Sequence, residues 1–543
     1  MKKYVTWVVV GVALAILIAL AVWASAQAAM VPRSSEAWSR GQIIGRTPVK
    51  RHVALQPAPD GGVFLIWQNL ERRLELVHIG MDGDVLLNRV LPAGTAEALD
   101  PQLQVGADGR LRLLWLEGEA NHATAHYVLL EADGTPVNPS QMLSDPASPV
   151  LDTPQLIIDA EGRYHTIWAD GEGIQWATLS AGGTLLSGPT MLVPQGRFPS
   201  VRTDNQGRLH LAWQRRGRAR ADSIYYAVLD PESGVKGEPE EIAQIILRTG
   251  QVLRGPIIGL TPETGYVLWE IQDYKYVFSM GGYAFFPLGL AQQRQIEELG
   301  LREGRNPAGM CSLERLQTPL LVALSESVPD PEVMDVLRSQ IAVVALEQGK
   351  VEEQVATASI QASLKPTLVV DDNSHLHLAW LETTEFGEYR VVYASTAPEV
   401  MKNYDALTLV DVLDAVFSNL FRLSILVVAL VAVLIIWALL PFLVLLVYHL
   451  VTSEETLDTV RSRVALVVVL VLVVVLTFAY PPRIGVEASW PALRWAAPVV
   501  AAAVAALVTV RVARRQKYSH LFTTFFLFTG VNSLVQVVMY LLL

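Results

Sequence analysis

The stretch Pro199-Ser-Val-Arg-Thr-Asp204-Asn-Gln-Gly207-Arg-Leu-His210-Leu-Ala-Trp213 decides the fold, because the same phrase recurs along the chain. A proline opens it, an aspartate and a glycine mark a turn, and alternating apolar residues lead into a tryptophan. Similar copies span residues 101–115, 154–168, 256–269 and 366–380, and a version without the proline ends at Trp67. Successive tryptophans lie 48, 53, 45, 56 and 111 residues apart. The last interval is about two periods, so one copy is expected to have decayed within residues 315–365.

Each repeat divides into four short strands. The first follows the proline, the second ends at the tryptophan, and the third alternates aromatic with aliphatic residues, as in residues 224–229. Turn dipeptides such as Asp133-Gly134 separate the third strand from the fourth. Four-stranded units at a pitch of about 45–50 residues predict an all-β propeller, with seven blades over residues 40–398 and six as the alternative. The final copy stops after its third strand, so a segment near Gly41–Val49 is expected to complete that blade.

The repeat resembles the BNR-like, sialidase-like group of bacterial propellers, whose blades often read Pro-x-aliphatic-x-x-Asp-x-x-Gly-x-x-His-aliphatic-x-Trp. The resemblance covers about two-thirds of the chain and implies the propeller fold, which hosts many activities. The Asp-box phrase Ser-x-Asp-x-Gly-x-x-Trp is not present as such. The arginine triad, acid and tyrosine nucleophile of sialidases have no identifiable counterparts in this sequence. The resemblance therefore implies no catalytic residue, and none is predicted.

The composition indicates a composite of an exported domain and membrane segments. Hydrophobic residues make up 51% of the 543 residues and charged residues 17%, which is too apolar for a soluble protein and too charged for membrane helices alone. Residues 1–30 are interpreted as a signal peptide or an N-terminal membrane anchor. A juxtamembrane amphipathic helix is expected over residues 399–423 and four transmembrane helices over residues 424–543. The basic loops place residues 31–398 outside the cytoplasm, as in a multi-pass bacterial cell membrane protein with a large extracytoplasmic domain.

Charge and cysteine content limit the partners of the chain. The formal net charge is −11, and the acidic excess lies in the repeat region, which would repel phosphate backbones and argues against nucleic acid. Cys311 is the only cysteine, so no internal disulfide can form. The expected partners are the lipid bilayer and a glycan or protein ligand on one face of the propeller. No cofactor or metal ion is predicted, and the oligomeric state is left open.

One cluster of arginines departs sharply from the acidic background. Its members follow the second strand of one blade and are Arg215, Arg216, Arg218 and Arg220. Loops between second and third strands open on one face of a propeller, opposite the Asp-x-x-Gly turns. Four guanidinium groups on that face could hold a carboxylate, sulfate or phosphate, although a solvated loop is the favoured interpretation. These arginines are the predicted ligand-binding residues.

The repeated aspartates and histidines are interpreted as structural. Aspartates recur just before the second strand, at Asp108, Asp159, Asp204 and Asp371. They are expected to accept hydrogen bonds within their own turns. Histidines recur three residues before a tryptophan, at His165, His210 and His377. This odd offset puts histidine and tryptophan on opposite faces of the strand, so both are expected to pack against neighbouring blades rather than converge on a metal ion.

Two further segments carry expectations. Residues 279–316 break the repeat period and are expected to form an insertion with a helix over Gln292–Leu299, and such insertions often carry specificity. In the last apolar segment, Asn532 and Gln536 lie one helical turn apart and are expected to hydrogen-bond to a neighbouring helix.

These features favour a binding or scaffolding module for a glycan, peptide or partner protein. One alternative is a sialidase-like glycoside hydrolase, which would need a carboxylic acid and a nucleophile on either side of a sugar. A second alternative is a sensor or an accessory subunit of a membrane complex. Side chains around the propeller axis discriminate between them, because an apolar or neutral plug there would exclude the enzyme.

Overall fold

The computed structural model describes residues 37–92, 97–118, 122–217, 220–230, 234–275, 278–301, 307–329, 337–384, 387–406, 437–479, 493–514 and 520–542, with residues 409, 413, 417 and 435. The chain divides into two compact units, one formed by residues 32–406 and the other by residues 1–31 with 407–543. The predicted signal or anchor over residues 1–30 lies outside the described residues, as does most of the predicted juxtamembrane helix over residues 399–423.

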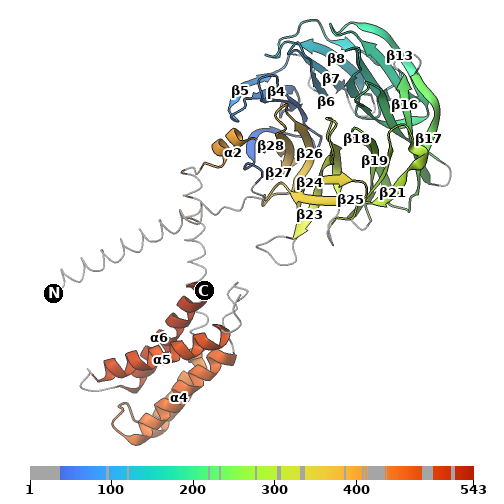
Figure 1. Ribbon diagram of the computed structural model, residues 1–543. Coiled ribbons are helices and arrows are strands. Elements are labelled where there is room, and N and C mark those ends of the chain that lie inside the picture. Colours follow the sequence, from blue (N-terminus) through green and yellow to red (C-terminus); the bar gives the residue numbers. More distant parts are fainter. Residues whose placement is uncertain are drawn as a thin grey trace. The chain divides into compact units, whose positions relative to one another are not determined.

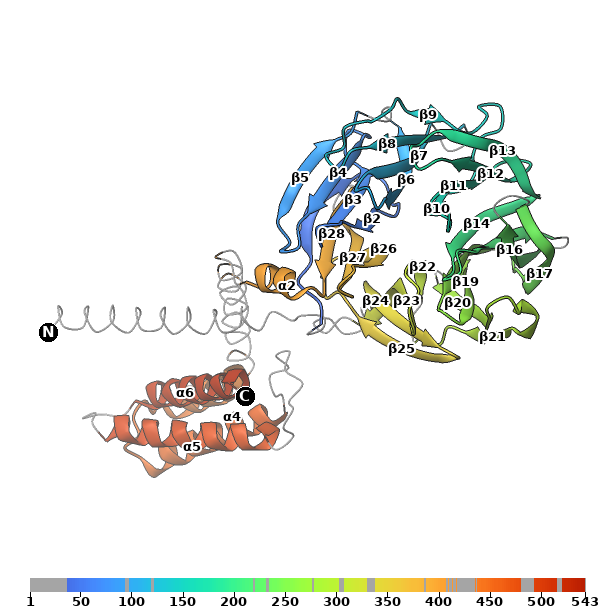
Figure 2. The same ribbon diagram turned by 45° about the horizontal axis from the view of Figure 1, so that its top comes forward.

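Seven four-stranded antiparallel sheets form the first unit and are arranged around a common axis (Figures 1 and 2). The seven-bladed propeller predicted from the repeat is therefore confirmed. The blades, numbered along the chain, follow the four-strand unit of the sequence, and the first strand of each blade lies innermost (Figure 2).

The strands of the first four blades are as follows. Blade one has β2 (Ala54–Pro57), β3 (Val63–Gln68), β4 (Leu74–Ile79) and β5 (Val85–Val90). Blade two has β6 (Ala98–Val105), β7 (Leu111–Glu117), β8 (Thr124–Leu130) and β9 (Gln141–Met142). Blade three has β10 (Gln155–Ile158), β11 (Tyr164–Ala169), β12 (Gly173–Leu179) and β13 (Leu185–Pro194). Blade four has β14 (Gly196–Thr203), β15 (Leu209–Arg216), β16 (Ala221–Asp230) and β17 (Gly234–Ile246).

Three more blades complete the ring. Blade five has β18 (Gln251–Leu260), β19 (Thr264–Asp273), β20 (Phe278–Pro287) and β21 (Gln295–Glu298). Blade six has β22 (Ala308–Ser312), β23 (Leu320–Pro329), β24 (Leu337–Glu347) and β25 (Lys350–Val355), and it is the copy that has lost the repeat phrase. Blade seven has β26 (Ser363–Val370), β27 (Leu376–Thr383) and β28 (Tyr389–Ser395), with β1 (Gln42–Thr47) as its outer strand.

The pairing of β1 with β28 closes the ring. The two strands run antiparallel, with Gln42 opposite Tyr393 and Thr47 opposite Tyr389. The N-terminal end of the unit thus supplies the strand that the last repeat lacks, as the sequence predicts for the segment near Gly41–Val49. Because this blade combines strands from both ends of the unit, the pairing of β1 with β28 holds the first and last elements of the ring together.

The segment 279–316 is not an insertion, and this prediction was wrong. It contains most of β20, then a short 3-10 helix (η1, Ala291–Gln293), β21 and β22, which are regular parts of blades five and six. The helix expected over Gln292–Leu299 is replaced by β21, because Gln295–Glu298 pairs with the edge of β20. Residues of high helix propensity therefore form a strand where an open sheet edge offers backbone hydrogen bonds.

The recurring tryptophans fill the spaces between blades. Trp67, Trp115, Trp168, Trp213 and Trp380 are at most 2% exposed. Trp213, for example, packs with Ile167, Ile174 and Trp176 of the preceding blade. Removing such a side chain from a packed core costs about 3–5 kcal/mol, so the tryptophans account for a large part of the cohesion between blades.

The recurring aspartates and histidines form buried pairs behind these interfaces. In blade four, Asp204 Oδ1 accepts a hydrogen bond from the Arg208 backbone N–H at 2.8 Å, as expected for a turn. Its Oδ2 also accepts from His210 Nε2 at 2.9 Å, and His210 Nδ1 lies 2.6 Å from the Tyr226 hydroxyl. The aspartate therefore ties the turn to the second strand in addition to shaping the turn.

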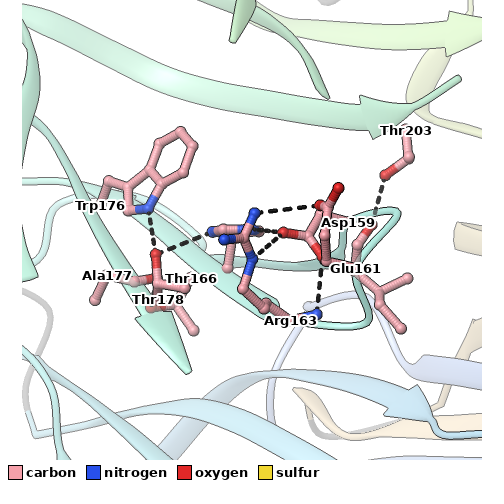
Figure 3. Close-up of polar contacts among 10 residues, drawn as sticks. Asp159, Glu161, Arg163, Thr166, Trp176, Ala177, Thr178 and Thr203 are labelled. Atoms are coloured by element: carbon pink, nitrogen blue, oxygen red, sulfur yellow. Dashed lines mark hydrogen bonds and ion pairs between the residues drawn. The ribbon is translucent and has the colours of Figure 1, made fainter. Parts of the chain in front are cut away.

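Blade three repeats this arrangement. Asp159 Oδ2 accepts from His165 Nε2 at 2.8 Å and from Arg163 Nε at 2.7 Å, while Thr178 accepts from Trp176 Nε1 at 2.9 Å (Figure 3). His165 faces the Trp176 side of its strand, whereas Trp168 packs with Leu114 and Leu116 of blade two. The predicted opposite placement of histidine and tryptophan is therefore correct.

Blade two replaces this pair with an arginine. Arg112 stands three residues before Trp115, is 2% exposed, and donates to both carboxylate oxygens of Asp108 at 2.9 and 3.0 Å. Asp108 lies seven residues before its tryptophan, whereas Asp159 and Asp204 lie nine residues before theirs. The prediction that Asp108 occupies the same position of the repeat was therefore wrong. The aligned position is Gly106, where a Cβ would come within 1.9 Å of the Arg112 guanidinium. The longer side chain of Arg112 therefore requires a glycine at position 106, and it pairs with the carboxylate of Asp108, two residues later.

Acid is expected to destabilise the propeller through these pairs. Burial holds the pKa of His377 at about 4, below the ordinary value of 6.5. Between pH 6.5 and pH 4 the unfolded chain binds more protons at this histidine than the folded chain does. The contribution of His377 to the free energy of unfolding is therefore full above pH 6.5 and is lost as the pH falls toward 4. Urea unfolding at pH 7 and pH 5 should show the loss, and the slope should be shallower in His377→Phe. Equal pH dependence in the two proteins would contradict this assignment.

The second unit is helical. It contains α4 (Val460–Ala479), α5 (Leu493–Ala513), α6 (Leu521–Leu542) and an apolar helix over Trp437–Thr452. Within the described residues, Val460–Ala479 and Ala496–Ala513 are long and apolar enough to cross a membrane, whereas the apolar stretches Trp437–Thr452 and Leu521–Gln536 are shorter. This supports a membrane association of the unit, although only two of the four predicted spans reach spanning length there.

The polar residues of α6 do not form the predicted hydrogen bonds. Asn532 and Gln536 are fully buried, and neither amide group has a hydrogen-bond partner among the residues that the structure describes. Buried unpaired amides are costly in an apolar environment.

Candidate functional site

The two faces of the propeller differ in what they carry. We call the face with the connections between second and third strands, such as residues 170–172, the loop face, and the opposite one the turn face. Both ends of the unit lie on the turn face: the Ser39 N–H donates to Ser395 at 2.9 Å, and Tyr404 of α2 (Pro398–Tyr404) donates to the Gly83 carbonyl at 2.6 Å. The first strand of every blade starts on the loop face, next to the axis (Figure 2).

A bulge near the start of the first strand recurs in five blades. Its register shift falls where one residue adopts a positive φ, namely Asp100 (47°), Phe198 (51°), Gly255 (90°), Gly309 (59°) and Lys365 (53°). In four of the five, the following residue is the proline of the repeat phrase. A bulge re-aims the side chain of its extra residue. For phenylalanine and lysine a left-handed backbone costs about 1–3 kcal/mol, and such strain is typical of functional positions.

These residues define one position per blade around the axis. Alignment of the repeats places His52 and Thr153 at the same position in blades one and three. We call this set the axial ring, and its members are His52, Asp100, Thr153, Phe198, Gly255, Gly309 and Lys365. The first strands of neighbouring blades contact one another all the way round, which brings the members of the ring together.

Cationic groups gather around Lys365 of the axial ring. Burial lowers the pKa of Lys365; among its charged neighbours, Glu270 opposes the shift, and Lys50, Arg254 and Arg51 add to it. Lys365 forms no ion pair with a carboxylate among the described residues. A partly buried ammonium group beside three other cations and without a paired carboxylate favours an anion.

The two carboxylates beside Lys365 already have other partners. Asp100 is 8% exposed and lies 3.1 Å from Arg51, between their Oδ2 and Nη1 atoms. Burial raises the pKa of Asp100 despite the nearby Arg51 and Lys365. Glu270 is 3% exposed and accepts hydrogen bonds from the Gly309 N–H at 2.9 Å and from Gln272 Nε2 at 2.6 Å. The surroundings of Lys365 therefore hold four cations against two engaged carboxylates.

His52 carries no charge at neutral pH. Burial, and next the Lys365 ammonium, hold the pKa of His52 at about 3. Its Nδ1 lies 3.0 Å from the Pro366 carbonyl and can donate to it, which joins blade one to blade seven beside Lys365. The neutral ring adds polarity to the site without adding a fifth positive charge.

The turn-face end of the axis is bridged by hydrogen bonds. Glu314, just after β22, accepts from Gln56 of blade one at 3.0 Å and from Gln104 of blade two at 3.3 Å. Arg202 of blade four donates to the Ser312 carbonyl at 3.4 Å. Polar side chains of four blades are therefore joined at the turn-face end, where Arg202 is one cation, whereas four cations, Lys365 among them, gather at the loop-face end.

The predicted arginine cluster also lies on the loop face, but its described members reach different neighbours. Arg215 and Arg216 end β15 and are exposed, and Arg215 Nη2 donates to Gln195 Oε1 at 3.2 Å. Arg220 donates to the Thr249 hydroxyl. Arg218 lies outside the described residues. The structure thus leaves these arginines a proposal, and it adds the axial ring, which sequence reasoning missed.

A signal for the axial ring was present in the sequence. The residue before each phrase-opening proline varies from aspartate to phenylalanine, glycine and lysine, while the phrase itself is nearly constant. Variation at one position of a regular repeat marks a place where packing does not fix the side chain. No group of three or more histidine, cysteine or acidic residues that could hold a metal ion occurs in the described part of the chain.

Comparisons with known proteins return similar folds only. No family model and no curated protein matches the sequence. Among solved structures, the polysaccharide lyase Uly1 is 12% identical, with 68% of this chain and 94% of that chain covered and a TM-score of 0.45. An ulvan lyase from a new family of polysaccharide lyases is 9% identical over 68% and 99% of the two chains, with a TM-score of 0.44. An endo-arabinase from Bacteroides thetaiotaomicron is 15% identical over 46% and 95%, with a TM-score of 0.32.

Proposed function

We propose that the propeller is a binding module for an anionic ligand, which docks at the loop-face end of the axis. The observation that carries the proposal is the convergence of Lys50, Arg51, Arg254 and Lys365 around two carboxylates that are already engaged. This set is positive within a chain whose formal net charge is −11. The charge of the site is therefore opposite in sign to the net charge of the chain, which is expected of a local binding site rather than of a general surface field.

The ligand must carry a carboxylate, sulfate or similar group. An ammonium group whose pKa is lowered by burial and by like charges gains stability when an anion arrives, because the anion favours its protonated form. Charge-assisted hydrogen bonds of this kind contribute about 1.5–3 kcal/mol each. The turn-face end carries the carboxylate of Glu314, and its cation Arg202 already donates to Ser312, so an anion is attracted less there.

A pair of lysine variants tests this function. Lys365→Met in the full chain is expected to weaken binding of inorganic sulfate and of trigalacturonate by about tenfold or more, the equivalent of about 1.4 kcal/mol. Lys350→Met, at an exposed lysine of β25, is the matched control and should bind as the wild type does. Isothermal titration at two salt concentrations measures both, and affinity should fall with salt. Equal affinity of the two variants would refute the proposal.

A sialidase-like glycoside hydrolase is the second candidate, favoured by one observation. Asp100 lies on the axial ring, and burial raises its pKa, which is the property that a general acid requires. The axial ring includes the charged residues Asp100 and Lys365 and is therefore not apolar throughout, so the enzyme is not excluded on that ground. Release of sugar from sialosides or acidic polysaccharides by the wild type, and its loss in Asp100→Asn, would favour hydrolysis. Binding without release by the wild type would favour the module.

We also propose that the helical unit tethers this module to a bacterial membrane, with the propeller outside the cytoplasm. The two helices of spanning length support a membrane association. Protease treatment of intact spheroplasts tests the orientation: the propeller should be cut from outside. Protection of the propeller in spheroplasts, with cleavage only after lysis, would contradict it.

A further inference from the structure

The axial ring is uneven around its circumference. Lys365 of blade seven, His52 of blade one and Asp100 of blade two make one side polar and charged. Gly255 and Gly309, of blades five and six, contribute no side chain. Phe198, of blade four, is the aromatic member. A ligand that uses the whole ring would therefore meet a cationic group on one side and an aromatic face on another.

Phe198 is held in an unusual state for a phenylalanine. Its backbone is left-handed, with φ of 51°, and its N–H donates to the buried Asp152 Oδ2 at 2.9 Å. Its side chain remains partly exposed, and the guanidinium of Arg197 lies 5.8 Å from the ring centroid. A strained and partly exposed aromatic residue contributes less to the core than the buried tryptophans do, so its placement suggests contact with a ligand.

We propose that the ligand is an acidic oligosaccharide, with its carboxylate or sulfate at Lys365 and Arg51 and the apolar face of a sugar ring against Phe198. This inference rests on the proposed anion-binding function and names the ligand class of the same site. A sugar ring has a C–H face suited to an aromatic side chain and hydroxyl groups suited to polar neighbours such as Thr153 and Asp100. An acidic peptide would also satisfy the cations, but it would not require an aromatic platform at this position.

A substitution at Gly309 can neutralise the positive charge around Lys365. A Cβ built there would lie 3.5 Å from Lys365 Cδ and 3.8 Å from Nζ, which is ordinary contact, so a small side chain fits. The φ of 59° falls in the left-handed region that aspartate and asparagine tolerate better than other residues. Gly309→Asp would therefore place a carboxylate beside Lys365, and Gly309→Asn is a neutral control of the same shape.

The test measures two probes, inorganic sulfate and trigalacturonate, on the full-length protein. Gly309→Asp is expected to weaken binding of both probes at least tenfold more than Gly309→Asn does, because only the aspartate adds a negative charge beside Lys365. Phe198→Leu is expected to keep sulfate affinity but to weaken trigalacturonate binding at least tenfold, while Phe198→Tyr, which keeps an aromatic ring, should retain most of the trigalacturonate affinity that Phe198→Leu loses. Thermal unfolding of each variant verifies that the propeller is folded.

The outcomes separate this inference from the function on which it rests. If Phe198→Leu binds trigalacturonate as the wild type does, the proposed sugar platform is wrong, while a loss of sulfate binding in Gly309→Asp keeps the anion site. If Gly309→Asp binds sulfate normally, the anion site itself is refuted. An acidic peptide such as tetraglutamate that binds as tightly as trigalacturonate, and is unaffected by Phe198→Leu, would assign the site to peptides instead.

Discussion

Replacing residues 42–47 with a glycine–serine linker of equal length is expected to abolish cooperative folding of the propeller. This change removes β1, which supplies the outer strand of blade seven and joins the two ends of the unit. Without it, β28 presents an open edge and the ring loses its closure, which is a route to aggregation. Thermal unfolding and limited proteolysis of the full chain measure the effect.

The matched control replaces β25, residues 350–355, with the same linker. β25 is also an outer strand of six residues, but it joins β24 within blade six and does not connect the ends of the ring. It should lower the unfolding temperature while leaving one cooperative transition. Equal damage from the two replacements would show that closure by β1 has no special role.

Packing at the closure explains why a smaller change should also be harmful. Gly45 of β1 lies against Trp67, where a Cβ would come within 2.3 Å of the indole, and Trp67 Nε1 donates to the Arg46 carbonyl at 3.2 Å. The closing strand β1 therefore packs directly against Trp67, the tryptophan of blade one. Any larger residue at this position must displace either β1 or the indole.

Asp204→Ala is expected to lower the free energy of unfolding by about 3–5 kcal/mol, because it breaks a buried charged network. The side chain of Asp204 is fully buried, and its oxygens accept from Arg208 Nε at 2.7 Å and from His210 Nε2 at 2.9 Å as well as from the turn backbone. Removing it leaves His210 with an unpaired Nε2 in the core. Urea unfolding at pH 7 provides the measurement.

Asp133→Ala is the control for this prediction. Asp133 also shapes a turn, with its Oδ1 accepting from the Thr135 N–H at 2.9 Å, but its side chain is 62% exposed. Its loss should cost less than about 1 kcal/mol. A similar cost for both variants would mean that the buried contact with His210 adds nothing to the turn.

The sequence predicts the propeller well because the repeated residues make the same packing contacts in each blade. A tryptophan such as Trp213 must fill one interface in every copy, so its spacing gives the blade count and the missing outer strand. The same regularity gives a wrong prediction at Asp108, since an arginine in the histidine position moves the acid by two residues. At Gln295–Glu298, an open sheet edge decided the structure against local helix propensity.

The candidate site could not be predicted in the same way. Lys365, Arg51 and Asp100 lie on three blades, and their proximity depends on how tightly the ring closes around its axis rather than on any local pattern. The arginine cluster is obvious in the sequence because its four members lie within residues 215–220, yet Arg215 and Arg220 have different neighbours in the structure. Closeness along the chain was thus a poor guide to closeness around the axis.

Amide hydrogen exchange of the whole protein, measured with and without saturating trigalacturonate, tests most directly where a ligand binds. The proposed site predicts slower exchange for amides at the starts of the innermost strands, in residues 50–54, 196–200 and 363–368, with no change in the turns at 204–208 or 371–375. Slowing confined to the turn face or to the arginine loop, or no slowing anywhere, would contradict the central role given to the cationic end of the axis.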